Sequence, residues 1–171
     1  SGLGVSYRYS EGLAYAMTGP AREDVAEIHQ FLREPHETAP SVGDVEEVQR
    51  QLERCRARDT ADKAVQYFDL AGRMLGQMRT YAAGDWVDLT FEKGMPLWLV
   101  RCHNIEFIND RTAKIYGDRD ASPIELRPIT RFAPPFIVEA EVKPISALYG
   151  AIRTGITIGA GEVKGREQRP A

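Results

Sequence analysis

The chain has 171 residues, of which 43% are hydrophobic and 27% charged, and its formal net charge is −3. That hydrophobic content is enough for a buried core and excludes a globally disordered chain. The acidic balance argues against a protein that coats nucleic acid, and no apolar run reaches the ~18 residues that a membrane-spanning helix needs. No signal peptide is visible at the N-terminus, so we expect a soluble protein whose compartment the sequence leaves open.

The cysteines and histidines indicate neither a disulfide scaffold nor a metal centre. Cys55 and Cys102 lack CxxC spacing, and two interpretations remain: buried free thiols, or a single bridge. The three histidines are scattered: His29, His36 and His103. Pro35 breaks the helical spacing between the first two, so they form no helical ligand pair. Because no phosphate-binding or dinucleotide-binding glycine motif is present, we predict no cofactor.

Residues 1–84 are predicted to be mainly helical. Within residues 3–17, apolar residues alternate with polar ones, which predicts an N-terminal hairpin or edge strand, although the Ala-rich YAMT could also lead into a helix. Residues 20–33 form an apolar stripe with helical spacing that ends before Pro35. A second helix is predicted to start at Asp44 with Glu47 in a capping box, and to break and restart near residues 58–60.

Residues 85–164 change to a spacing of two, which predicts antiparallel strands separated by turns. The predicted strands are DWVDLTF (85–91), PLWLVRCHNIEFIND (96–110, as two short strands or one bent strand), AKIYG (113–117), PIELRPI (123–129, at an edge), APPFIVEAEVKP (133–144) and AIRTGITIGAGEV (151–163). Short strands with a turn signal every eight to twelve residues are typical of a sandwich or barrel. Residues 165–171 are predicted to be a polar tail.

The stretches DLTFEKGMPLWLV, IEFINDRTAKIYGD and PPFIVEAEVKP resemble the opening strands of concanavalin A-like jelly rolls. That superfamily includes laminin-G-like modules, legume-type lectins and endoglucanase-type glycoside hydrolases. Six residues match a strand pattern that recurs there: Phe136, Glu139, Ala140, Val142, Lys143 and Pro144. The resemblance covers at most residues 85–160. It implies a partial jelly roll, since about six or seven strands are predicted instead of a dozen or so, and a carbohydrate-binding or carbohydrate-processing domain.

The sharpest catalytic candidates are Glu139 and Glu141. On a strand, residues two apart share a face at roughly 7 Å, and paired carboxylates can hydrolyse glycosides. The resembled hydrolases carry Glu-x-Asp-x-Glu, whereas here Lys143 stands where another carboxylate would be needed. We therefore predict that both glutamates lie on the solvent face of a half-buried strand, and glycoside hydrolysis remains the alternative. The predicted core residues of that strand are Phe136, Val138, Ala140 and Val142.

Two further groups are candidates for ligand binding. Asp118 and Asp120 follow Gly117 and could supply oxygens to Ca²⁺, although turn chemistry also explains them. Trp86 and Tyr149 could form an aromatic platform for a sugar, while Trp98 lies in an apolar run and is predicted to be buried.

These observations predict an α+β protein, in which an N-terminal helical hairpin or three-helix unit packs on a C-terminal antiparallel β-sandwich or partial jelly roll. For function, the sequence favours a non-catalytic binding or assembly module, such as a structural subunit of a larger complex, with protein partners or self-association. A carbohydrate-binding or carbohydrate-processing domain is the alternative, and a small enzyme of another type ranks third.

Overall fold

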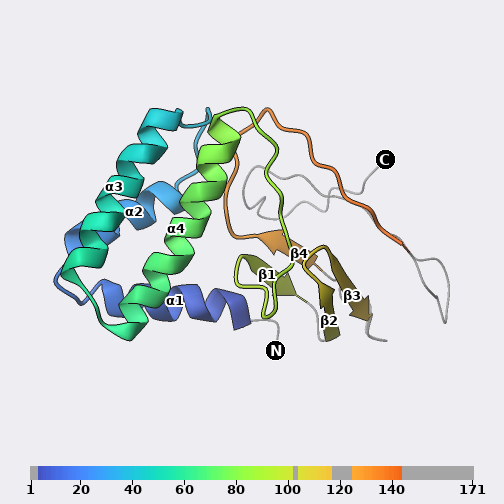
Figure 1. Cartoon of the computed structure of the whole chain (residues 1–171), viewed down its shortest axis with the longest axis horizontal. Coiled ribbons are helices and arrows are strands. Elements are labelled where there is room, and N and C mark those ends of the chain that lie inside the picture. The colour runs from blue at the N-terminus through green and yellow to red at the C-terminus, as the bar shows by residue number, and fades with distance from the viewer. Residues whose placement is uncertain (1–3, 102–103, 117–124, 144–171) are drawn as a thin grey trace, which may run out of the picture. The chain divides into compact units, whose positions relative to one another are not determined.

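The computed structural model describes residues 4–101, 104–116 and 125–143. The chain divides into two compact units, residues 1–134 and 135–171, and nearly all described residues belong to the first. Helices come first along the chain and short antiparallel strands follow (Figure 1), so the predicted α+β class is confirmed. The described elements are α1 (Gly4–Ala16), α2 (Arg22–Arg33), α3 (Val42–Arg58), α4 (Asp62–Ala82), β1 (Trp98–Arg101), β2 (Asn104–Asn109), β3 (Thr112–Tyr116) and β4 (Glu125–Pro128).

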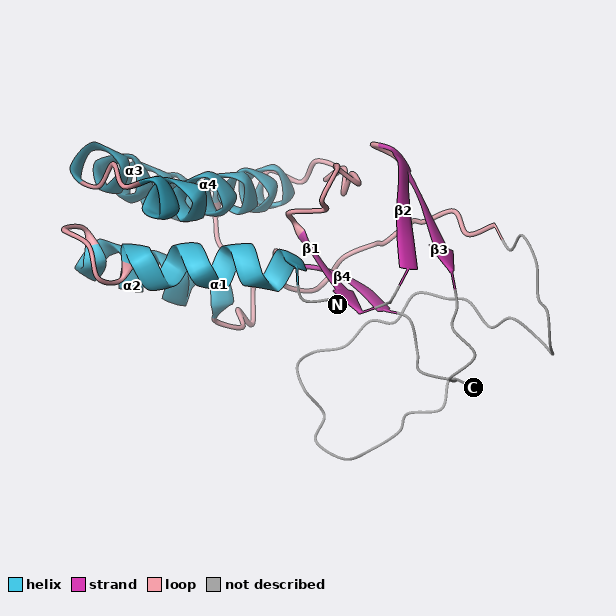
Figure 2. Ribbon diagram, turned by 90° about the horizontal axis from the view of Figure 1, so that it is seen from below, coloured by secondary structure: helices cyan, strands magenta, loops and turns pink. Residues whose placement is uncertain are grey.

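The core of the first unit lies between the helices. Helices α3 and α4 form one layer over α1 and α2 (Figure 2), and α4 contacts all three of the others. The largest fully buried side chains come from α2, α3 and α4: Val25, Ile28, Leu32, Val45, Leu52, Cys55, Tyr67, Phe68, Met74 and Leu75. Their helical spacing in the sequence is what predicted these three helices, because each helix buries one apolar stripe.

Local backbone and capping preferences set the end of α2 and the start of α3. Helix α2 ends at Arg33 because Glu34, which precedes Pro35, is extended (φ −69°, ψ 133°). Helix α3 begins two residues before the predicted start: Ser41 Oγ accepts the N–H of Asp44 at 3.1 Å, and Asp44 returns the contact to the N–H of Ser41 at 3.3 Å. The predicted break between α3 and α4 is confirmed at residues 59–61.

The prediction of a strand in residues 3–17 was wrong, because this segment forms α1. The alternation of tyrosines suggested a strand, but Tyr9, Gly12 and Ala16 recur at helical spacing and are buried together. The helix buries this face against α4, and a period of two would have turned half of it to solvent. Packing of α1 on α4 therefore overrides the local alternation.

The four described strands form two separate two-stranded antiparallel sheets. In the first, β1 pairs with β4, with Trp98 opposite Pro128 and Arg101 opposite Glu125, and β1 also contacts α1. In the second, β2 and β3 form a hairpin. The predicted strands in residues 96–110, 113–117 and 123–129 are thus confirmed, whereas the described residues form no sandwich or jelly roll.

Two predicted strands are not strands in the structure. In residues 85–91, Val87, Leu89 and Phe91 are half-buried and their neighbours exposed, as predicted, but no other segment of the described residues pairs with this one along a ladder. Residues 133–143 form no strand either. Apart from buried Ala133 and half-buried Phe136, their side chains are exposed, so the predicted core positions Val138, Ala140 and Val142 were wrong. Alternation predicts a strand only where a partner strand is available.

Candidate functional site

The β2–β3 hairpin has one polar and one apolar face. On the polar face, Tyr116 donates a hydrogen bond to Glu106 at 2.7 Å, and the Lys114 ammonium lies 4.9 Å from the centre of the Tyr116 ring. On the apolar face, Ile105 stands opposite Ile115. The register shifts between Phe107 and Asn109, so the side chain at position 108 faces no partner across the hairpin.

The hairpin is attached to the rest of the first unit mainly through the loop that precedes β1. Among the described helices and strands, β2 and β3 contact only each other. Their attachment consists of an ion pair between Arg111 and Asp88, a hydrogen bond from the Phe91 N–H to the Asp110 carbonyl at 2.6 Å, and packing of Ile105 on the core. Among the described strands, β2 and β3 pair only with each other, and an isolated two-stranded hairpin is at best marginally stable in water.

Exposed large hydrophobic side chains gather in the part of the chain that contains the hairpin. Of the nine in the described residues, seven lie after residue 84: Trp86, Ile108, Ile115, Tyr116, Ile137, Val138 and Val142. The hairpin contributes Ile108, Ile115 and Tyr116, which are 47%, 38% and 42% exposed. Ile115 lies on the apolar face and Tyr116 on the polar face, so the exposed apolar side chains of the hairpin are distributed over both of its faces. Single exposed apolar residues are ordinary, whereas several on one short element favour a contact surface.

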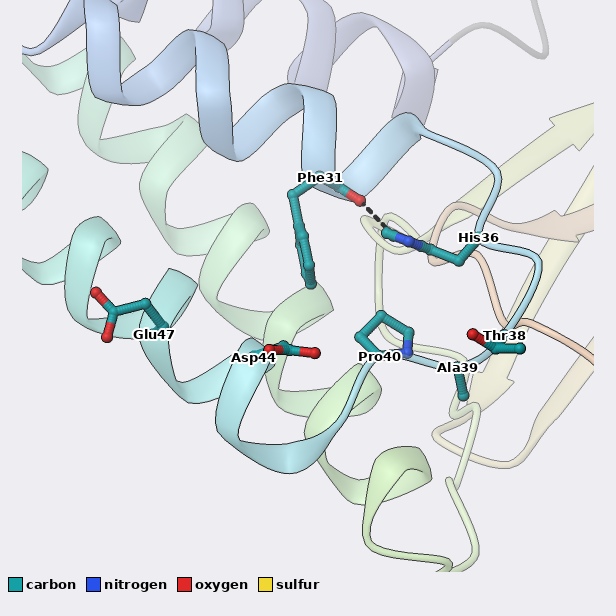
Figure 3. A pocket seen from close by; sticks show the side chains of 7 residues that line it. All are labelled: Phe31, His36, Thr38, Ala39, Pro40, Asp44 and Glu47. Atoms are coloured by element: carbon teal, nitrogen blue, oxygen red, sulfur yellow. Dashed lines mark hydrogen bonds between the residues drawn. The ribbon is translucent and has the colours of Figure 1, made fainter.

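A second feature of the surface is a hollow of about 450 Å³ between the end of α2 and the start of α3 (Figure 3). Its lining residues are Phe31, His36, Thr38, Ala39, Pro40, Asp44 and Glu47. The imidazole Nε2 of His36 bonds to the Phe31 carbonyl at 3.0 Å, and the two rings lie 5.1 Å apart, so each fixes the position of the other. The Phe31 ring extends from α2 toward Asp44 and Pro40.

A smaller hollow of about 300 Å³ lies between α4 and the loop that precedes β1. Its lining residues are Arg73, Gly76, Gln77, Thr80, Val87, Asp88 and Leu97. Ion pairs occupy its charged groups, because Arg73 pairs with Glu92 and Asp88 pairs with Arg111. Thr80 donates to the Gly76 carbonyl, and Gln77 accepts from Thr130, so the polar lining already has partners within the chain.

A third feature is a cluster of titratable side chains where α1, α2 and α4 pack together. The Tyr9 hydroxyl and His29 Nδ1 share a hydrogen bond of 2.9 Å, and the Tyr9 ring lies 5.3 Å from the Tyr67 ring. Burial, and secondarily the nearby Arg33 cation, lowers the pKa of His29, whereas burial raises the pKa of Tyr9. Arg33 itself donates to the Ile129 carbonyl at 2.9 Å. This cluster lies inside the helical packing and lines neither hollow.

The lowered pKa of His29 predicts a loss of stability in mild acid. The unfolded chain binds a proton at this imidazole near pH 6.5, and the folded chain does so only at lower pH. The neutral imidazole of His29 therefore makes its full contribution to the free energy of unfolding above pH 6.5. That contribution is lost as the pH falls from 6.5 to the folded pKa. We expect the urea midpoint of the wild type to drop more between pH 7.5 and 5.5 than that of His29→Gln, and equal drops in both would contradict this assignment.

The catalytic candidates Glu139 and Glu141 lie in the described part of the second unit, in an extended segment that forms no strand. Both side chains are exposed, and neither lines a described hollow. The strand face that would have aligned the two carboxylates is therefore absent from residues 135–143.

The other candidates are distributed as follows. Trp86 is 68% exposed on the loop before β1, while Trp98 is half-buried and donates to the Thr90 carbonyl at 3.0 Å. Asp118, Asp120 and Tyr149 lie outside the described residues, as do His103 and Cys102. In the described part of the chain, no group of three or more metal-ligating side chains comes together.

Cys55 is a buried free thiol, as in the first of the two interpretations of the cysteines, and it forms no bridge. Burial raises the pKa of this thiol to about 11, so the thiolate that would react with an oxidant or a metal is scarce at neutral pH. Cys55 is thus a core residue of α3.

Sequence reasoning missed both the exposed face of the hairpin and the hollow beside Phe31. The hairpin strands themselves were predicted, but which of their faces is covered depends on elements distant in the sequence. For the hollow a signal was present: the stretch EPHETAPSVGDVEE (34–47) contains five carboxylates and neither lysine nor arginine. In the sequence, only Asp44 and Glu47 of this run were interpreted, as capping residues of the second helix.

The chain matches no protein-family model, no curated protein and no solved structure. The resemblance to concanavalin A-like jelly rolls therefore stays a prediction. No helix among the described residues has both the length and the apolar character needed to cross a bilayer.

Proposed function

We propose that this chain is a non-catalytic binding and assembly module, and that the β2–β3 hairpin is the element through which copies of the chain associate. One observation supports the proposal above the others: the hairpin contacts no other described helix or strand, yet exposes Ile108, Ile115 and Tyr116. An uncovered ribbon of this kind is a liability for a monomer, because its edges and apolar residues favour pairing with another chain.

The four-helix unit supplies the rigid base that such a module needs. It buries most of its own large apolar residues, and the loop before β1 anchors the hairpin to it through Asp88 and Phe91. Association would bury Ile115 and Ile108 on the hairpin and could add a strand beside β2 or β3, which pair only with each other among the described strands. The gain in apolar burial is about 25 cal/mol for each Å² removed from water.

The proposal is tested by the mass of the full chain in solution. We expect light scattering to give a mass above the 19.1 kDa of one chain as the concentration rises. Ile115→Asp places a charge in the proposed contact, so it should weaken association by roughly tenfold or more. Hydrogen exchange of residues 104–116 should slow with increasing concentration in the wild type and not in the variant.

Tyr15→Asp is the matched control, because Tyr15 is also an exposed large hydrophobic residue but lies on α1. It should leave the mass of the assembly unchanged. A mass of one chain at every concentration, or an equal effect of the two substitutions, would overturn the hairpin as an assembly surface.

A further inference from the structure

The hollow beside Phe31 combines an aromatic ring with an excess of negative charge. Five carboxylates lie in residues 34–47, without any lysine or arginine: Glu34, Glu37, Asp44, Glu46 and Glu47. Among the described residues, two of these five have ion pairs, Glu46 with Arg79 and Glu47 with Arg50. The pair with Arg50 is exposed on both sides, so it competes weakly with another cation. The surface around the hollow therefore keeps a net negative charge.

The walls of the hollow suit a long cationic side chain. Phe31 is half-buried and its ring extends toward Pro40 and Asp44 (Figure 3), and Ala39 and Glu47 are among the other residues that line the hollow. An arginine stacks its planar guanidinium on an aromatic face and forms paired hydrogen bonds with a carboxylate. Its aliphatic stem can lie along apolar surface while the charge stays at the rim.

From this charge complementarity we infer that the hollow binds an arginine-bearing, extended peptide segment of a protein partner. The guanidinium would lie over the Phe31 ring, within reach of Asp44 and Glu47. This inference names the chemistry of one partner of the proposed binding module and rests on that proposed function, but it uses a surface separate from the hairpin. His36 has a positioning role, because its bond to the Phe31 carbonyl holds the loop that forms one wall.

The inference is tested by titrating the full chain with the peptide acetyl-Gly-Arg-Gly-Arg-Gly-amide and recording amide ¹H–¹⁵N spectra. We expect saturable shifts confined to residues 31–47, and none with the matching peptide in which citrulline, an uncharged isostere, replaces arginine. Phe31→Leu and Glu47→Gln should each weaken binding about two- to fivefold, because one removes the ring and the other a carboxylate.

Glu53→Gln is the matched control. Glu53 lies on the same helix and pairs with Arg56 three residues later, as Glu47 does with Arg50, but it does not line the hollow. This substitution should leave peptide affinity unchanged. Shifts spread over the whole acidic surface, equal loss in Glu53→Gln and Glu47→Gln, or no shift at residues 31–47 would each overturn the inference.

Two comparisons distinguish this inference from a small-cation site and from the assembly proposed for the hairpin. L-argininamide that binds as tightly as the peptide would identify a small-cation site and would also overturn the peptide assignment. The Ile115→Asp variant keeps the hollow intact, so it should bind the arginine peptide like the wild type. Loss of assembly with retained peptide binding, or the reverse, therefore shows which of the two proposals fails.

Discussion

Gly12→Ala is expected to destabilise the helical unit by about 1–3 kcal/mol, although alanine is the better helix former. At Gly12, helix α1 lies directly against the backbone of α4. A Cβ at this position would lie 2.9 Å from the backbone nitrogen of Tyr67 and 3.0 Å from the backbone carbonyl of Lys63. Because these atoms belong to a helix backbone, no side-chain rotation relieves the contact, and α1 must move away from α4 and open the core.

Gly76→Ala is the control for this prediction, since Gly76 is also helical and a Cβ there would meet no atom within 4 Å. It should raise the free energy of unfolding by about 0.5–1 kcal/mol through helix propensity. Urea denaturation of both variants measures the difference. If Gly12→Ala were as stable as Gly76→Ala, the close packing of α1 on α4 would be wrong.

The helices α2, α3 and α4 could be predicted because the information is local. Each has an apolar stripe of period 3.6, and Pro35 and Ser41 bound the loop between α2 and α3 with their own backbone preferences. Helix α1 could not, because its short buried face of Tyr9, Gly12 and Ala16 is recognisable only once α4 lies against it.

The strands show the same limit of prediction from the sequence, because their positions are local and their pairing is not. The positions of β1 and β4 follow from alternation and turn residues, but their pairing joins Trp98 to Pro128 across 30 residues. Segment 85–91 has the burial pattern of a strand without a partner strand, and in residues 133–143 the pattern fails as well. Pairing is a non-local property, so a period of two indicates which face is apolar more securely than it indicates a sheet.

The same difference between local pattern and non-local packing explains which candidate sites could be predicted. The pairing of Glu139 and Glu141 required a strand that does not form. The hairpin surface exists because Ile115 stays exposed, and that exposure depends on how distant parts of the chain pack. Only the hollow beside Phe31 had a signal readable in advance, in the charge of residues 34–47, and its shape still required the packing of α2 against α3.

Tyr67→Phe is expected to stabilise the protein, which is unusual for a substitution at a fully buried position. The Tyr67 side chain is completely buried, and its hydroxyl, although close enough to Tyr9 to interact with it, forms no hydrogen bond of good geometry with a described residue. Burying an unpaired hydroxyl costs about 1–3 kcal/mol, and burial also raises the pKa of Tyr67. Phenylalanine keeps the ring contacts with Tyr9 and Phe68 and removes that cost.

Tyr9→Phe removes the same atom from a neighbouring ring and should have the opposite sign. The Tyr9 hydroxyl bonds to His29, so its loss should lower the free energy of unfolding by roughly 1 kcal/mol. Urea denaturation at pH 7.5, where His29 is neutral, measures both changes under the same conditions. A loss of stability in Tyr67→Phe would show that its hydroxyl has a partner such as a buried water, since the two variants differ only in which hydroxyl is removed.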